Sequence, residues 1–400
     1  MLKVHSEPSK KAALKRSGPA LFALGFRPFF SAAGVAAVVL ILIWILTWMG
    51  RLAIPDYYGV IGWHSHEMLF GYAAAIIAGF LLTAVRNWTG VNTPSGKPLV
   101  LLGLLWLGGR LLPLLSGYIP DWTVAVVDLA FLPAAALSIQ PALWQGDQKI
   151  NRIFVPILMF MALANLLVHL QALGFSSSAG RGIDMMLYMV VFLVSLLGGR
   201  VMPFFTQAVI PGFQAIRRPW LETTTMAAFA VLVLLQLFET PPLLTGLTAL
   251  LLAITQALRV AGWYHPQVWK TPILWVLYSG MFWMVIGFLM LGLSSVGLVG
   301  GNLAKHALSV GGIGVLTLGM MSRVALGHSG RPLDPARSIE IAFILLNIAA
   351  AARVFGPLLP IGNYTFWVHL SGGLWIICFL IFCWVYLPIL SKPRLDGKSG

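Results

Sequence analysis

Charged residues are scarce in this sequence of 400 residues: Asp, Glu, Lys and Arg together make up only 10% of it. Soluble globular domains carry about a quarter of their residues as these four types, so the composition excludes an ordinary soluble enzyme. The mean hydropathy is +0.88. Apolar runs of about twenty residues, long enough to span a hydrocarbon core of about 30 Å, recur along the chain. We therefore expect an all-α membrane protein with no separate soluble domain.

Cysteine is almost absent. Cys378 and Cys383 are the only two, and both lie in the last apolar run. This excludes a disulfide framework and the C-x-x-C-H motif that attaches haem covalently, so any haem would be held by coordination alone. The first apolar run is too long for a signal-peptide core and lacks a clear cleavage site, which predicts that it is retained.

Acidic residues are outnumbered by basic ones, 12 against 26, and the formal net charge is +14. A basic stripe on a folded surface would indicate a nucleic-acid partner, but here the basic residues lie in the short breaks between apolar runs. Alternate breaks and the two ends of the chain hold 21 of them, whereas the other side has only Arg51 and Arg181. Cytoplasmic loops retain positive charge, so we expect a multi-pass protein of the bacterial inner membrane with both termini in the cytoplasm.

The apolar runs predict about twelve transmembrane helices, with bounds accurate to a few residues. The runs at 219–239 and 241–262 are the hardest to separate, and they meet at Thr240-Pro241-Pro242, a strong helix stop. The twelve predicted helices are 30–50, 62–86, 98–117, 121–144, 150–174, 183–203, 219–239, 241–262, 271–297, 300–324, 337–358 and 364–391.

The spacing of these runs is compatible with an internal repeat. Runs begin near 62, 183 and 300 at nearly equal intervals, and His66 precedes Gly90 by the same distance that separates His306 from Gly330. Such spacing is typical of a pseudo-three-fold repeat of four-helix units. We divide the chain into a basic cytoplasmic tail, a single transmembrane domain and a second cytoplasmic tail, at 1–29, 30–391 and 392–400.

Histidines gather at one depth of the predicted membrane domain. Counting about 1.5 Å per residue from the nearest helix end places five of the eight in the outer third: His64, His66, His169, His306 and His369. A lone histidine in a span is usually a hydrogen-bonded structural residue, but neutral imidazole also binds haem iron, non-haem iron and copper. Five at one level predict a haem or metal site, and a purely structural role stays open for His169 and His369.

The densest coordination chemistry lies in the segment Trp63-His64-Ser65-His66-Glu67-Met68. On a helix, His64 and His66 would point about 200° apart and could serve two centres on opposite faces; in an extended segment they could chelate one metal. Glu67 would share the face of His64, as a metal ligand or catalytic carboxylate, unless it is simply an N-terminal helix charge. His66 is also a candidate axial haem ligand.

Charged side chains inside the predicted spans lie near the same level as these histidines. Arg110 and Arg353 could pair with haem propionates, or they could form ion pairs with Asp128 and Asp184, and the sequence leaves both interpretations open. At the opposite, cytoplasmic ends of the spans, His328 is a candidate metal ligand, proton-entry group or helix cap.

Four stretches of the chain resemble the NnrS family: LGFRPFF at 24–30, WHSHEMLFGYAAAIIAGFLLTAVRNWTG at 63–90, GGRVMPFFT at 198–206 and GMMSRVALGHSGRP at 319–332. They extend from the first predicted helix to the tenth, so the resemblance covers nearly the whole chain. It implies a twelve-helix membrane protein that carries haem and copper, is made by bacteria in response to nitric oxide and contributes to resistance to nitrosative stress. The motifs contain His64, His66 and His328, His306 lies just before the last of them, and the resemblance assigns no metal to any of these histidines.

We therefore expect a lipid-embedded protein that contains haem b and copper, or non-haem iron, and that binds and removes nitric oxide. An oxidoreductase that reduces nitric oxide would need an electron donor such as a quinol or a cytochrome. Two alternatives remain. A haem-copper respiratory reductase would have an adjacent His-His pair, which this sequence lacks. A transporter of metal or small anions would place its site near the midplane, whereas these histidines lie off-centre.

Overall fold

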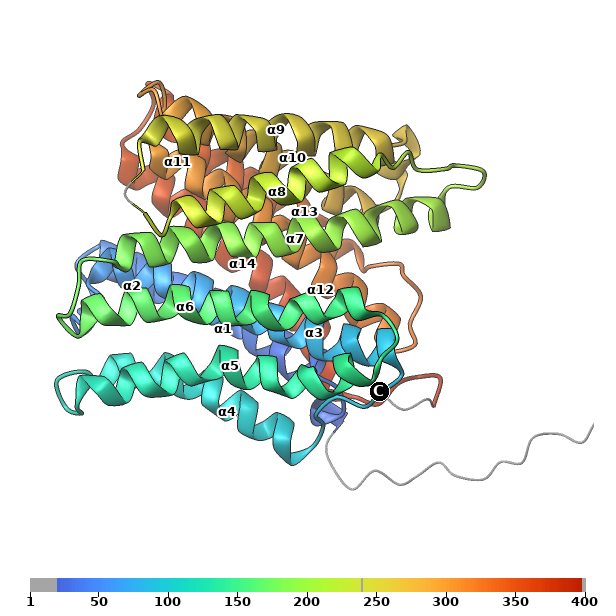
Figure 1. The fold of residues 1–400 in the computed structure, drawn as a ribbon, viewed down its shortest axis with the longest axis horizontal. Coiled ribbons are helices and arrows are strands. Elements are labelled where there is room, and N and C mark those ends of the chain that lie inside the picture. The colour runs from blue at the N-terminus through green and yellow to red at the C-terminus, as the bar shows by residue number, and fades with distance from the viewer. Residues whose placement is uncertain (1–19, 239, 398–400) are drawn as a thin grey trace, which may run out of the picture.

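The computed structural model describes residues 20–397 except residue 239, and this part of the chain is built from helices and has no strand. Figure 1 shows the long helices side by side with roughly parallel axes, so that the connections lie at the two ends of the bundle. Most of the predicted N-terminal tail, through residue 19, and the last three residues of the C-terminal tail lie outside the described residues.

Each of the twelve predicted apolar runs corresponds to a helical segment in the described part of the chain. The helices are α1 (Phe26–Trp48), α2 (Val60–His66), α3 (Ala74–Thr89), α4 (Lys97–Leu111), α5 (Asp121–Gln145), α6 (Phe154–Ala172), α7 (Ala179–Val209), α8 (Pro219–Leu235), α9 (Pro242–Trp263), α10 (Pro272–Ser294), α11 (Gly301–His306), α12 (Val315–His328), α13 (Arg337–Val354) and α14 (Tyr364–Ser391). Two π-helical segments, Glu67–Ala73 and Ala307–Gly314, join α2 to α3 and α11 to α12. Short 3₁₀ turns occupy Ala20–Phe22, Leu112–Leu115, Lys149–Ile153, Pro266–Lys270 and Gly356–Leu358.

Eleven of these segments are long and apolar enough to cross a membrane, where the sequence predicted about twelve. The remaining one is α8, an apolar helix that ends at Leu235 and is shorter than the predicted run at 219–239. Proline occupies the first helical position of α8, α9 and α10, where its fixed φ suits a helix start and its missing N–H costs no bond. The predicted stop before Pro242 is therefore also the start of α9.

Helix α1 begins at Phe26, inside the predicted tail. The first N–H groups of a helix have no partner within it, and here the backbone N–H of Phe26 donates to the Thr83 hydroxyl on α3, at 2.9 Å. This partner lies 57 residues away in the sequence. Tertiary packing therefore sets this boundary, which local sequence patterns do not reveal.

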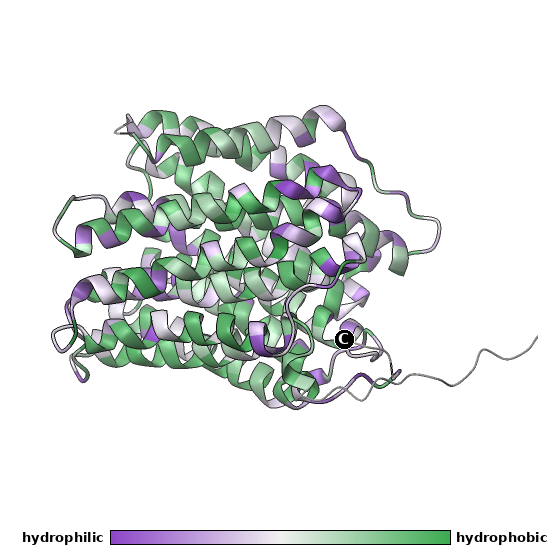
Figure 2. Cartoon of the chain, turned by 60° about the horizontal axis from the view of Figure 1, so that its bottom comes forward, coloured by the Kyte–Doolittle hydropathy of each residue, from purple (hydrophilic) through white to green (hydrophobic). Residues whose placement is uncertain are grey.

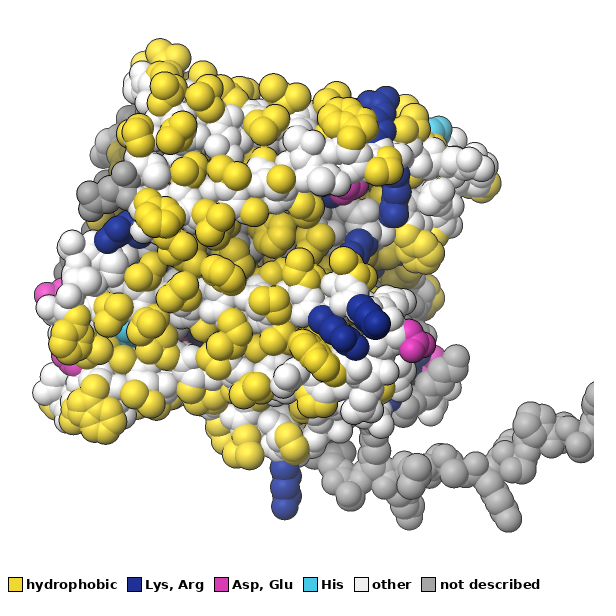
Figure 3. Space-filling view, in the orientation of Figure 1, with side chains coloured by type: hydrophobic (Ala, Val, Ile, Leu, Met, Phe, Trp, Pro, Cys, Tyr) yellow, Lys and Arg dark blue, Asp and Glu magenta, His cyan; other side chains and the backbone are white. Residues whose placement is uncertain are grey.

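The sides of the bundle are apolar and its ends are polar (Figure 2). Large hydrophobic side chains remain exposed along the helices, among them Leu104 at 57%, Leu137 at 62% and Ile254 at 60%. Hydrophobic side chains cover most of the face in Figure 3, and the Lys and Arg side chains gather mainly toward one end. Lipid solvates such a surface, and helices satisfy their own backbone hydrogen bonds in it. The chain is a multi-pass membrane protein.

The two spans with π-helical segments are the most buried: 83% of the apolar window in Val60–Thr89 and 78% of that in Gly301–His328 lie inside the bundle. In each, the π segment directly follows a histidine, His66 or His306, and the span ends before a left-handed glycine, Gly90 (φ 71°) or Gly330 (φ 73°). Helix α7 contacts both π segments. The third run of the predicted repeat is α7 itself, which is continuous α-helix and has no histidine.

Candidate metal centre and adjoining cavity

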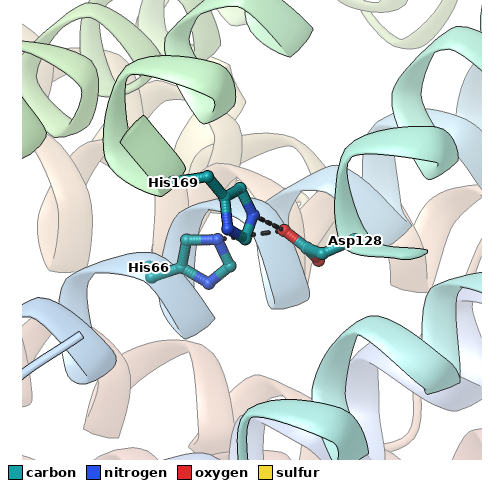
Figure 4. A group of neighbouring side chains, drawn as sticks. All are labelled: His66, Asp128 and His169. Atoms are coloured by element: carbon teal, nitrogen blue, oxygen red, sulfur yellow. Dashed lines mark hydrogen bonds and ion pairs between the residues drawn. The ribbon is translucent and has the colours of Figure 1, made fainter. Parts of the chain in front are cut away.

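His66, at the end of α2, points into a buried group with Asp128 of α5 and His169 of α6 (Figure 4). Asp128 Oδ2 lies 3.1 Å from His66 Nε2 and 3.0 Å from His169 Nε2. One ligand atom from each residue can be chosen so that all three lie within 4.8 Å of one another. A metal bound at about 2.0–2.2 Å holds neighbouring ligand atoms roughly 3 Å apart, so the donor set fits a metal ion.

A second layer of polar groups holds these three side chains. His66 Nδ1 lies 3.2 Å from Glu67 Oε1, and the Asn165 amide donates to Asp128 Oδ2 at 2.7 Å. The Tyr57 hydroxyl lies 2.9 Å from His169 Nδ1. Metal-binding histidines usually direct their second ring nitrogen at such a carboxylate or hydroxyl partner. Both histidines of this group have that arrangement.

Tyr57 and Tyr58 precede α2 and cover the centre from the loop after α1. Tyr58 stacks on the His66 ring with centroids 4.2 Å apart. Burial raises the pKa of both phenols well above the usual range, and the nearby charge of Asp128 raises it further. Both hydroxyls therefore stay protonated, and Tyr57 can donate to His169 Nδ1. His169 Nε2 must then donate to Asp128, because a carboxylate only accepts.

Arg110 of α4 brings the positive charge of the group. Its guanidinium forms an ion pair with Asp128 Oδ1 and lies 3.4 Å from Glu67 Oε2. A Cβ at Gly71 would lie 2.7 Å from Arg110 Nη1, so only glycine leaves room there. Two carboxylates face one guanidinium, and both nitrogens of His66 face oxygen acceptors. The buried group is thus balanced by one further positive charge, either a proton on His66 or a metal ion.

His64 points to the other side of α2 and lines a cavity of about 150 Å³ together with His306 of α11. The Trp44 ring stacks on His64 with centroids 4.3 Å apart. His306 Nδ1 donates to the Asn302 carbonyl at 2.7 Å. A carbonyl oxygen only accepts, so the Nε2 lone pair of a neutral His306 stays available as a ligand.

The cavity has donors for a haem but not the space of a haem pocket. Pockets that enclose drug-sized ligands measure roughly 300–1,000 Å³, well above the 150 Å³ found here. Arg353 and His369 lie outside its lining. The Arg353 guanidinium donates to the Tyr364 hydroxyl at 2.7 Å, while its Nη1 and His369 Nε2 are buried without a hydrogen-bond partner among the described residues. As it stands, the cavity accommodates a small ligand.

Of the five histidines predicted to share one depth, the structure brings four together in two groups and leaves His369 apart. The Glu67 carboxylate contacts His66 rather than His64, with Oε1 3.2 Å from His66 Nδ1. His328 lies at the opposite ends of the spans, with its ring 5.6 Å from that of Phe26 and its carbonyl bound by Arg394.

One of the ion pairs anticipated from the sequence is present: Arg110 pairs with Asp128. Asp184 pairs instead with Lys305, at 2.6 Å at the edge of the cavity, while Arg353 donates to the Tyr364 hydroxyl. The sequence alone did not single out Asn165 or Tyr57. Asn165 could have been found, because it precedes His169 by four residues on one helix and therefore shares its face. Tyr57 lies in a loop with no pattern to mark it.

Comparison with protein families matches residues 20–394 to the NnrS protein family, and the match covers nearly all of the chain. Comparison with curated proteins gave no match. This family is associated with metal and haem binding, which agrees with the buried His/Asp/His group. The chain therefore belongs to the NnrS family and is a membrane protein of the nitric oxide response.

Proposed function

We propose that this protein holds a redox metal ion at His66, Asp128 and His169 and removes nitric oxide at the cavity of His64 and His306. One observation carries the proposal: His64 and His66, two residues apart in one buried segment, point into two different sites, each with a second histidine. Polar groups inside a membrane domain are costly and usually functional. Two such sites back to back suit a two-centre metalloprotein.

Copper or non-haem iron is the proposed ion for the His66 site. Two imidazoles with one carboxylate are a common ligand set for non-haem iron, and imidazole also suits copper. When bound, the ion would supply electron transfer and an open coordination position. His66 and His169 would each bind through Nε2. The Tyr57 hydroxyl can donate or accept, so it can hold His169 in either tautomer.

Haem b is proposed for the cavity side of the segment because of the residues that could hold it, and not because of the cavity volume. His306 Nε2 would hold the haem iron, and Arg353 Nη1, which is buried without a hydrogen-bond partner among the described residues, would hold a propionate. The macrocycle would require the cavity to widen.

Glu67 is the proposed proton-holding group. Reduction of two nitric oxide molecules to nitrous oxide and water consumes two protons and two electrons. Glu67 Oε1 contacts His66 Nδ1, and Oε2 lies beside Arg110, so a proton passed to this carboxylate would lie next to the metal ligand. The electrons would come from an external donor of the quinol or cytochrome class.

The orientation proposed for the membrane follows from the basic residues. Arg323, Arg331 and Arg394 lie at the ends of the bundle opposite His64 and His66, in line with Lys and Arg gathering at one end in Figure 3. Because cytoplasmic loops retain positive charge, that end would face the cytoplasm of a bacterial inner membrane. The two histidine sites would then lie near the outer face.

The test uses the purified protein in detergent. We expect a Soret band, a stoichiometric copper or iron content beyond haem, and nitric oxide consumption by the reduced protein above that of free haem at equal concentration. A protein that contains neither haem nor metal would overturn the proposal and favour a transporter. Haem and metal without consumption would restrict the function to binding nitric oxide.

A further inference from the structure

A second cavity, of about 80 Å³, lies between the two π-interrupted spans and α7, deeper in the bundle than the first. Helices α1, α3, α7, α10 and α12 contribute to its walls. On the two π-interrupted spans and α7 its lining includes Ala73, Phe80, Val190, Leu197, Thr317 and Met320. Neither histidine group reaches this cavity.

The lining offers nothing to a polar guest. The one side-chain hydroxyl in the cavity lining belongs to Thr317. It donates to the Ile313 carbonyl at 2.7 Å and lies 2.7 Å from the Tyr72 hydroxyl. A cavity without free polar partners stays dry and takes apolar guests instead. A volume of 80 Å³ suits a molecule of a few atoms. The apolar lining therefore favours a small apolar gas over water or an ion.

The second cavity continues the first. On three elements the lining passes from one cavity to the other within one helical turn: Tyr72 to Ala73, Leu187 to Val190, and Ile313 to Thr317. The hydrogen bond between Tyr72 and Thr317 crosses this boundary. These two side chains form the partition between the histidine cavity and the apolar one.

The apolar cavity is also open at its side. Several lining residues on α3, α7 and α12 are partly exposed: Phe80, Val194, Leu197, Val201 and Met320. Phe80 lies nine residues and Met320 eight residues before the ends of their spans, which at 1.5 Å per residue is roughly 12–14 Å. Their exposed sides therefore lie at the level of the hydrocarbon core, where apolar gases concentrate.

We infer that the apolar cavity takes up nitric oxide from the hydrocarbon core and passes it across the Tyr72–Thr317 partition to the cavity of His64 and His306. That the guest is nitric oxide rests on the proposed function. The inference adds that nitric oxide arrives through the side of the bundle, from the hydrocarbon core. A route changes how fast a ligand enters and leaves, but not how tightly the final site holds it.

The experiment compares Leu197→Trp with Leu196→Trp. Both leucines lie on α7 and are partly buried, but only Leu197 lines the cavity. Xenon, an apolar atom of suitable size, would be detected by crystallography or ¹²⁹Xe NMR. Nitric oxide association and release would be followed by flash photolysis of the reduced protein. We expect Leu197→Trp to lose xenon binding and to slow both rates several-fold at an unchanged Kd, whereas Leu196→Trp behaves as wild type.

A second variant guards against misfolding. A Cβ at Gly198 would make only ordinary van der Waals contact, 3.6 Å from Met281 Sδ, so Gly198→Ala narrows the cavity without strain and should slow both rates in the same direction. Rates that stay unchanged in both variants would overturn the inference, as would xenon that binds elsewhere in wild type. If wild type binds xenon here but no nitric oxide, the proposed function fails and the cavity remains.

Discussion

The two sites on either side of α2 are built in opposite ways. Around His66, six polar side chains from the loop before α2 and four helical elements lie in mutual contact, and Asp128 is only 4% exposed. Around His64 and His306 there is a cavity, an available ring nitrogen and an apolar wall. A dense group of paired charges resists rearrangement, whereas a cavity lined by a ring nitrogen with a free lone pair can bind a ligand. One short helix thus separates a site suited to an ion from a site suited to a ligand.

The spans that carry the two sites share a backbone feature. In each π-interrupted span, one histidine, His66 or His306, is followed at once by a π segment. Such segments are rare and often occur at functional sites. Yet His66 is fully buried among ionisable partners, while His306 bonds to a backbone carbonyl and faces the cavity. The same backbone feature therefore serves two different environments.

Loss of the carboxylate at the centre should have the largest effect. Asp128→Asn removes the charge that pairs with Arg110 and that contacts both histidines. Removal of one partner from a buried ion pair costs roughly 3–5 kcal/mol, so we expect a clearly lower Tm in detergent and loss of the metal.

The matched control for that substitution is Asp184→Asn. Its partner Lys305 has a side chain that is 41% exposed, and such pairs contribute roughly 0–1 kcal/mol. We expect little change in Tm or in metal content. Equal destabilisation by the two substitutions would contradict the distinction between the sites.

Two neighbouring tyrosines give a sharper test of the metal site. Tyr57→Phe removes the hydroxyl that bonds to His169 Nδ1, and loss of such a partner lowers metal affinity by about 10–100-fold. Tyr58→Phe removes a hydroxyl that has no hydrogen-bond partner among the described residues, so affinity should stay near wild type. Metal titration of both variants would measure the difference, and equal affinities would argue that His169 is not a ligand.

The smallest effect is expected from Trp44→Leu on the cavity side. The substitution removes the ring stacked on His64, an aromatic contact worth roughly 0.5–1.5 kcal/mol. We expect an altered absorption spectrum or nitric oxide affinity at the cavity, with the metal content of the His66 site unchanged. A fall in that metal content would show that the two sites are not independent.

Much of the fold could be predicted from the sequence, because lipid imposes long apolar runs and proline marks their starts. The opposite directions of His64 and His66 followed from helical geometry alone. Other features depended on contacts between distant segments, which no local pattern records. Thr83 caps α1, Asn165 and Tyr57 complete the His66 site, and the Glu67 carboxylate contacts His66 instead of His64.

The most direct test of the two-site account is quantification of metal and haem in purified His66→Ala and His306→Ala. We expect a crossed result. His66→Ala loses the copper or non-haem iron and keeps the haem, while His306→Ala loses the haem and keeps the metal. If both variants lose the same component, or neither loses any, the account of two separate centres on one segment is wrong.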